Sequence, residues 1–301
     1  MTDKPSTIKH YSNLFKTLKK KYKALKHSLI GPFNENHSYY VNCFNINKIL
    51  FNKPQHFKEI LLDTNDFCNL QCVYCHNGRS KSKISIEDFN NFLLTQVASV
   101  YNFQIGCGME PTVDNRLLEF VKIISSSHAK PINNFRLQTN ATLIHRHDIN
   151  ALYKSGINNF TISIDSLDPI IHKEQRDNSD LQLILNNIKL IKDTCKKASI
   201  HFVTTVTSKS IDSLENLILY AISLKISLIE LRQMFYKPYG KDVIKDHNKM
   251  KELIIDTETF KNKTNILKEK YSSKIKIFIN NETDLDQTYL NTNYGTNLLF
   301  K

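Results

Sequence analysis

The sequence predicts an α/β protein whose body is a partial (β/α)6 barrel. Between residues 57 and 240, short segments rich in aliphatic and β-branched residues alternate with longer amphipathic segments. This alternation is typical of βα units arranged around a parallel sheet. The chain has 301 residues, of which 41% are hydrophobic, so it is long and apolar enough to bury a core of that size.

Six strands and five intervening helices are expected in this core. The expected strands cover residues 58–64, 101–106, 133–139, 158–165, 199–206 and 226–233. The expected helices cover residues 85–99, 113–128, 144–155, 179–197 and 210–224. Gly156 directly follows the third of these helices, at the position where a glycine in the left-handed conformation commonly ends a helix.

Two extensions flank the core. Residues 241–301 form a short C-terminal α/β extension, with one helix expected at 243–271 and one strand at 274–280. Residues 1–56 form an N-terminal extension, in which apolar residues recur every three to four positions between 8 and 30. That spacing predicts an amphipathic helix with a lysine-rich outer face.

The N-terminal extension carries most of the positive charge. The first 57 residues contain ten lysines against Asp3 and Glu35, which accounts for +8 of the net charge of +12. The basic helix either packs on the core with its lysines in solvent, or contacts nucleic acid, an acidic peptide or an anionic membrane surface. No apolar run reaches the ~18 residues of a transmembrane segment, and no apolar secretory signal opens the chain. A cytoplasmic location is therefore expected.

Three of the six cysteines crowd into one loop. Cys68, Cys72 and Cys75 have the spacing C-x3-C-x2-C and follow the first expected strand. A disulfide framework would spread its cysteines through a small secreted chain, so this cluster indicates metal binding. Three thiolates satisfy three irons of a [4Fe–4S] cluster and leave the fourth iron open, whereas an electron-transfer cluster normally takes four. The alternative is zinc with His76 as fourth ligand, in a nucleic-acid-binding protein, although its adjacency to Cys75 makes a tetrahedral site awkward.

The cysteine motif, with Tyr74 before its last cysteine, resembles the signature of the radical S-adenosylmethionine (SAM) superfamily. Three further stretches after later strands resemble motifs of the same family. They are Gly108–Pro111 for Gly-Gly-Glu-Pro, Gln138–Thr142 for Thr-Asn-Gly-Thr, and Ser163–Pro169 with His172 and Arg176 for the Ser-Leu-Asp segment of the molybdenum-cofactor-synthase-like and peptide-modifying branches. The four motifs occur in the family's order, each at the end of an expected strand.

The resemblance implies an enzyme that uses a [4Fe–4S] cluster to cleave SAM reductively to a 5′-deoxyadenosyl radical, which takes a hydrogen atom from a substrate. It implies a low-potential reductant, flavodoxin or ferredoxin. The substrate class stays open between a peptide, a nucleotide or RNA, and a small metabolite, and the basic helix favours an anionic one. No cysteine follows Cys195, so no C-terminal auxiliary cluster is expected and the chain differs there from the molybdenum-cofactor synthase itself. A non-catalytic module that binds the cluster and SAM is the other alternative.

The resemblance also implies a set of SAM-binding residues. They are Tyr74 beside the adenine, Gly108, Met109 and Glu110 toward the ammonium, Ser163, Asp165 and Arg176 toward the ribose and carboxylate, and Met234 near the adenine. Thr139 and Asn140 are expected at the barrel mouth. Met109 replaces a family glycine, and methionine does not readily take a positive φ.

Each assignment has a structural alternative. Tyr74 could simply pack the loop, Asp165 could cap a strand end, and Met234 could be a core residue. For Arg176 the alternative is a surface salt bridge with Glu174 or Asp177.

Cys107 is a candidate catalytic residue. It lies between Gly106 and Gly108 at a strand end, close to the expected substrate. A thiol is a good hydrogen-atom donor, so Cys107 could quench a substrate radical. The alternative is a small buried hydrophobe. Cys43 and Cys195 have no partner at ligand spacing and are expected to be structural.

Overall fold

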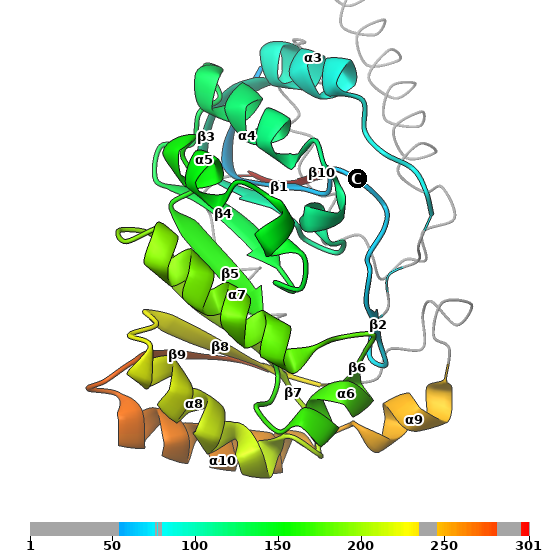
Figure 1. Cartoon of the computed structure of the whole chain (residues 1–301), viewed down its shortest axis with the longest axis vertical. Coiled ribbons are helices and arrows are strands. Elements are labelled where there is room, and N and C mark those ends of the chain that lie inside the picture. The colour runs from blue at the N-terminus through cyan, green and yellow to red at the C-terminus, as the bar shows by residue number, and fades with distance from the viewer. Residues whose placement is uncertain (1–53, 76, 78–79, 235–245, 282–295, 301) are drawn as a thin grey trace, which may run out of the picture.

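A computed structural model describes residues 54–75, 77, 80–234, 246–281 and 296–300 (Figure 1). Its body is one sheet of eight parallel strands in the order β10-β1-β3-β4-β5-β7-β8-β9, which curves into a partial barrel. The strands are β1 (Gln55–Leu62), β3 (Val97–Ile105), β4 (Asn134–Thr139), β5 (Asn159–Ser163), β7 (Ser199–Val206), β8 (Leu228–Gln233), β9 (Lys276–Asn280) and β10 (Thr296–Phe300). The predicted partial (β/α)6 barrel is confirmed, since its six strands are β1, β3, β4, β5, β7 and β8.

The boundary between the first expected helix and the second expected strand lies earlier in the chain than predicted. The expected helix at 85–99 ends at Gln96, and β3 begins at Val97, four residues before the predicted start. Val97 and Val100 are fully buried, and the β-branched run pairs with β1 from Gln55 onward. Burial against a neighbouring strand overrides the helical pattern of the preceding residues.

Helices cover one face of the sheet. They are α3 (Ile86–Gln96), α4 (Leu117–Ser126), α5 (Ile149–Lys154), α7 (Leu181–Thr194), α8 (Leu214–Ser223) and α10 (Thr257–Tyr271). In Figure 1, α3, α4 and α5 lie over the upper half of the sheet and α7, α8 and α10 over the lower half. Gly156 has a φ of 116° just beyond α5, as expected for a glycine that ends a helix. None of the described helices is long and apolar enough to cross a membrane.

Aspartate caps make two expected helices shorter. The segment 144–155 begins as a 3-10 turn (Ile144–Arg146), and α5 starts only after Asp148, whose carboxylate accepts from the Ala151 N–H. The single helix expected at 243–271 is instead α9 (His247–Glu252) and α10, because Asp256 caps α10 by accepting from the Thr259 N–H. Such caps satisfy N–H groups that a helix leaves unpaired at its start.

Four of the described helices and strands had no counterpart in the prediction. The helix α6 (Pro169–Gln175) starts at Pro169 with Asp168 as its cap. The two-residue strands β2 (Gln71–Cys72) and β6 (Arg176–Asp177) form a separate antiparallel ribbon, which lies on the right in Figure 1 with α6. The strand β10 extends the sheet beside β1. The expected basic helix at 8–30, Cys43 and His76 lie outside the described residues.

The two faces of the sheet differ in chemistry. On the helix-covered face, one row across four strands consists of buried apolar residues, Leu62, Ile105, Leu137 and Phe160. The adjacent row faces the inside of the partial barrel and contains Gln104, Arg136 and Asn159. Later inward positions include Gln138, Thr161, Ser163, His201, Thr205 and Glu230. In closed βα barrels, aliphatic side chains fill the interior in layers. Here the inward side chains are mostly polar, so they can form hydrogen bonds with a molecule bound inside the partial barrel.

Candidate active site

The cysteine loop lies between β1 and α3 and is partly accessible. Cys68, Cys72 and Cys75 are each half-buried. The Cys75 N–H donates to the Cys72 carbonyl (3.1 Å), so the C-x2-C segment is a tight turn. Burial raises the pKa of the Cys72 thiol to about 12; the positive charge of Arg176 opposes the rise, and the charges of Asp165, Cys75 and Cys68 add to it.

The residues fit the [4Fe–4S] cluster that the sequence motif predicts. Among the described residues, no three His, Cys, Asp or Glu side chains converge closely enough to hold a single ion. A cluster takes each cysteine through a different iron, so three neighbouring thiols on one loop are a suitable donor set without that convergence.

Asp165 is the centre of a buried hydrogen-bond network beside this loop. It follows β5 and is fully buried, and it accepts two hydrogen bonds from Arg176, from Nε (2.7 Å) and Nη2 (3.0 Å). The Tyr74 hydroxyl and the Thr205 N–H (2.8 Å) also donate to it. Asp165 thus joins the cysteine loop to β7 and to the ribbon strand β6.

Arg176 is buried rather than on the surface. It is 5% exposed, its guanidinium carbon lies 5.9 Å from the centre of the Tyr74 ring, and it pairs with Cys72 in the β2–β6 ribbon. Burial disfavours its charge, but Asp165 outweighs that effect and holds the pKa of Arg176 well above its usual value. The alternative of a surface salt bridge with Glu174 or Asp177 is wrong, because Glu174 pairs with Lys209 and Arg176 pairs with Asp165.

Glu110 connects the loops that follow β3 and β4. It is 2% exposed, and one carboxylate oxygen accepts from the Thr139 hydroxyl (2.6 Å) and from the hydroxyl and N–H of Thr112 (2.6 and 3.1 Å). The other oxygen accepts from the Asn140 N–H (2.7 Å). Burial raises the pKa of this carboxyl, and the hydrogen bonds from Asn140, Thr112 and Thr139 oppose the rise. This geometry favours a brace between loops over direct orientation of an ammonium group.

Asp63, which the sequence analysis missed, holds the glycine-rich loop. It follows β1 and is 6% exposed, and its carboxylate accepts from the N–H groups of Cys107 (2.8 Å), Gly108 (3.0 Å) and Met109 (3.2 Å). Three converging N–H groups suit an anion. The sequence feature that could have identified Asp63 is its position as an acidic residue at the end of an otherwise apolar strand.

The departure from the family motif at Met109 causes no backbone strain. Outside glycine, the described residues with positive φ are Ala141, Asn178 and Lys225, so Met109 does not need the conformation that methionine avoids. Ala141 has a φ of 60° and stands where the family's Thr-Asn-Gly-Thr stretch has glycine. Of the two residues that replace family glycines, Ala141 therefore has the strained backbone and Met109 does not.

Gly106 cannot accept a side chain. Its φ is 85°, and a Cβ there would lie 2.2 Å from the Gln138 carbonyl oxygen on β4. We expect Gly106→Ala to lower the free energy of unfolding by at least about 2 kcal/mol, because strain and a backbone clash combine. Urea unfolding measures this. The control is Gly108→Ala, whose Cβ would meet only the Asn77 side-chain amide, at 3.0 Å. Equal losses in the two variants would contradict the expectation.

A polar network connects Cys68 to the loop after β4. The Asn140 amide nitrogen lies 3.9 Å from the Cys68 sulfur and donates to the Asn69 side chain (3.0 Å). Asn69 in turn donates to the Thr142 hydroxyl (2.8 Å), which donates to the side-chain Oδ1 of Asn140 (2.6 Å). The Thr-Asn-Ala-Thr stretch therefore holds the first cysteine from one side, as Asp165 and Tyr74 hold the loop from the other.

The remaining predicted residues lie near the same end of the sheet. Ser163 ends β5 and is half-buried. Met234 follows β8, is 3% exposed and shares a small apolar cluster with Met250, Leu253, Val73 and Tyr74, so it packs beside the cysteine loop. Cys107 is half-buried. Cys195 is instead buried in the main core, far along the chain from the loop.

Comparisons with known proteins agree with this geometry. A model of the Radical SAM superfamily matches residues 63–221. The GTP 3',8-cyclase of Alkaliphilus oremlandii is 31% identical over 132 residues, which cover 41% of this chain and 39% of the relative. The probable GTP 3',8-cyclase of Sulfurisphaera tokodaii is 26% identical over 192 residues, which cover 62% of this chain and 59% of the relative. The chain thus spans less than two thirds of either relative.

Solved structures share the fold. Streptococcus suis SuiB bound to S-adenosylmethionine aligns with a TM-score of 0.59 at 15% identity and covers 90% of this chain and 62% of that one. Native anSMEcpe with bound AdoMet and the Cp18Cys peptide aligns with a TM-score of 0.56 at 18% identity and covers 75% and 63%. The family model covers more than half of the sequence, including all four strand-end motifs. The chain therefore belongs to the radical SAM superfamily.

Proposed function

We propose that this chain is a radical SAM enzyme that holds a [4Fe–4S] cluster on Cys68, Cys72 and Cys75 and cleaves SAM reductively. One observation carries the proposal: residues from all four motifs are joined by hydrogen bonds at one end of the sheet. Asp165 of the fourth motif accepts from Tyr74 of the cysteine loop. Asn140 of the third motif lies 3.9 Å from the Cys68 sulfur through its side-chain nitrogen, and its N–H donates to Glu110 of the second motif. A protein that only needed to fold around a metal would not require this convergence.

Held by Cys68, Cys72 and Cys75, the reduced cluster would supply the electron for cleavage of the carbon–sulfur bond of SAM that gives a 5′-deoxyadenosyl radical. The chain's own residues fix the surroundings. Asp63 orders the backbone at Gly108 and Met109, whose carbonyl groups are candidates for the SAM ammonium. The Gly108 carbonyl accepts from the Asn77 side chain (2.9 Å), so Asn77 is a further residue that orders this loop.

The remaining SAM contacts in the proposal are Ser163, Tyr74 and Met234, with Asp165 and Arg176 ordering them. Arg176 uses Nε and Nη2 on Asp165, so its main role is to fix Tyr74 and the β2–β6 ribbon. Glu110 keeps the loops after β3 and β4 together.

A polar substrate fits the inner face of the partial barrel. Gln138, Ser163, Thr205 and Glu230 are inward positions on four strands. Burial, with the positive charges of Arg136 and Lys276, lowers the pKa of His201 to about 4, so this side chain is a neutral hydrogen-bonding group near pH 7. Nucleotides, as for the GTP 3',8-cyclases, and peptides, as for SuiB and anSMEcpe, both belong to this class. We place the enzyme in the cytoplasm with flavodoxin or ferredoxin as reductant.

Cys107 is the proposed hydrogen donor to the substrate radical. Its thiol would give up a hydrogen atom and leave a thiyl radical, which one electron and one proton restore. In D2O the exchangeable thiol should deliver deuterium to the product. We expect Cys107→Ala to lose that label, whereas Cys195→Ala retains it because Cys195 is buried in the core. Full deuterium incorporation by Cys107→Ala, read by mass spectrometry, would remove Cys107 from the mechanism.

The central test is anaerobic reconstitution with iron and sulfide, followed by dithionite and SAM. We expect about four irons per chain and formation of 5′-deoxyadenosine and methionine, read by mass spectrometry. The triple variant Cys68→Ala, Cys72→Ala, Cys75→Ala should yield neither, whereas Cys195→Ala should match the wild type. Four bound irons without SAM cleavage would favour the non-catalytic module. Zinc without iron would favour the zinc protein.

A further inference from the structure

Arg176 and Cys72 lie directly opposite each other in the β2–β6 ribbon. Opposed residues of an antiparallel pair project their side chains from the same face, with Cβ atoms about 4.5–5.5 Å apart. The side chain of Arg176 and the thiol of Cys72, a proposed cluster ligand, therefore leave the ribbon on the same side. This pairing places a positive charge beside one ligand of the proposed cluster.

The ion pair of Arg176 and Asp165 has its positive end toward Cys72. Asp165 is held on its far side by the Thr205 N–H of β7 (2.8 Å), and it accepts from Nε and Nη2 of Arg176. Burial raises the pKa of the Cys72 thiol; among the nearby charges Arg176 has the largest effect and lowers it, and Asp165 has a smaller effect of opposite sign. The field of the pair at Cys72 is therefore positive.

The burial of this ion pair favours an electrostatic role. Arg176 is 5% exposed and Asp165 is fully buried. Two charges lose most of their hydration when they are buried, and an apolar pair of similar volume often gives equal or greater stability. Inside the protein, however, the same charges act on their neighbours with little screening by water. Arg176 is therefore well placed to act on a cofactor that Cys72 holds.

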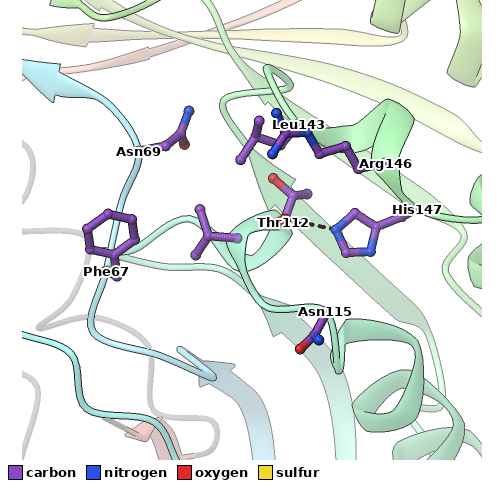
Figure 2. Close-up of a pocket in the computed structure, with 8 residues that line it drawn as sticks. Phe67, Asn69, Thr112, Asn115, Leu143, Arg146 and His147 are labelled. Carbon is purple, nitrogen blue, oxygen red and sulfur yellow. Dashed lines mark hydrogen bonds between the residues drawn. The ribbon is translucent and has the colours of Figure 1, made fainter.

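The other end of the cysteine loop is open to solvent. Phe67 and Asn69 flank Cys68 in the chain and line a cavity of about 550 Å³ (Figure 2). Phe67 is 45% exposed, and Arg146 is an exposed residue on the opposite side of the cavity. Water screens a charge at that position. Arg146 therefore provides a comparison for Arg176: the same charge near the same loop, but in solvent.

We propose that Arg176 tunes the cluster electrostatically: its charge, turned toward Cys72, raises the midpoint potential and makes the cluster easier to reduce. The proposal rests on the proposed function. Reduction adds one electron from the reductant and makes the cluster more negative, with no bond formed or broken, so a nearby positive charge stabilises the reduced form. Net charge and hydrogen bonds around the sulfurs are among the features that set cluster potentials. Asp165 holds the guanidinium in place and partly offsets its charge.

The test is a redox titration of the reconstituted protein without SAM, followed by electron paramagnetic resonance of the reduced cluster. We expect Arg176→Gln to lower the midpoint potential, because the positive charge is lost whether or not Asp165 then takes up a proton. We expect Asp165→Asn to raise it, because the arginine stays charged and nothing offsets it. Each shift should correspond to a roughly tenfold change in the equilibrium constant for reduction, or about 59 mV for one electron.

Two exposed positions provide matched controls. Arg146→Gln removes an arginine charge at the cavity, and Glu215→Gln removes a carboxylate charge on α8. Both should leave the midpoint potential within error of the wild type. Arg176→Lys keeps the charge but loses the planar fork that binds Asp165, so its potential should stay closer to the wild type than that of Arg176→Gln. This comparison decides the proposal even if Asp165→Asn fails to hold a cluster.

The outcomes separate tuning from a purely structural role. A structural role would shift Arg176→Gln and Asp165→Asn in the same direction, or Arg176→Lys as far as Arg176→Gln, and either result refutes the proposal. A shift in Arg176→Gln no larger than that in Arg146→Gln refutes it as well. A wild type that holds no four-iron cluster, or that does not cleave SAM with dithionite, would instead refute the proposed function.

Discussion

Asp165→Asn is expected to lower the free energy of unfolding of the cluster-free protein by about 3–5 kcal/mol. The substitution keeps the shape of the side chain but removes its charge. Arg176, which is 5% exposed, would then hold an uncompensated buried charge, and Tyr74 would lose its acceptor. Urea unfolding under reducing conditions, followed by circular dichroism, measures the loss.

An exposed ion pair provides the control. Glu215 and Lys270 pair on the surface at 2.7 Å, with side-chain exposures of 39% and 58%, so Glu215→Gln should cost far less than Asp165→Asn. The double variant Asp165→Asn, Arg176→Met should recover part of the stability, because it leaves no unpaired charge. If Asp165→Asn costs no more than Glu215→Gln, the buried network does not stabilise the fold and only positions the loop.

Glu110→Gln is expected to weaken both the fold and SAM binding. Glutamine would turn a donating NH2 group toward the Asn140 N–H or toward the hydroxyls of Thr112 and Thr139, which all donate to Glu110. Hydrogen bonds to a charged group are each worth about 1.5–3 kcal/mol, so we expect a loss of about 2–3 kcal/mol in unfolding free energy. We also expect a fall of roughly tenfold in SAM affinity, measured by calorimetry on the reconstituted protein.

Glu119→Gln is the matched control for this change. Glu119 is exposed on α4, close in sequence to Glu110 but outside the braced loops. It should leave both quantities within experimental error of the wild type. Normal SAM affinity in a Glu110→Gln protein that is nonetheless destabilised would show that the brace serves folding alone.

Local patterns were sufficient to predict the barrel. The six core strands contain apolar residues on the helix-covered side, such as Leu137 and Phe160, which raise the hydropathy of each segment above its neighbours. The helix starts at Asp148 and Asp256 were harder to predict. The helical pattern of apolar residues continues on both sides of each capping aspartate, so it hides the start of the helix. The ribbon β2–β6 has two residues per strand and joins segments about a hundred residues apart, so no local periodicity predicts it.

The site was predictable only where a motif carried it. The three cysteines and the stretches at Gly108 and Ser163 are recognisable by residue type and spacing. The role of Asp63 depends on three N–H groups of a different strand's loop, and the partner of Arg176 is eleven residues away rather than adjacent. Such contacts depend on how the strands lie beside one another in the sheet. The spacing of residues along the chain carries no information about that arrangement.

The division between the two faces of the sheet has a consequence for how this chain can diversify. The apolar face, with Leu62, Ile105 and Phe160, supplies the burial that stabilises the fold. The inward positions, such as Gln138, Thr205 and Glu230, contribute little to that core. A library restricted to them could therefore be screened for new substrates while most members still fold. In this architecture, substrate specificity can evolve, or be engineered, with little loss in the free energy of unfolding.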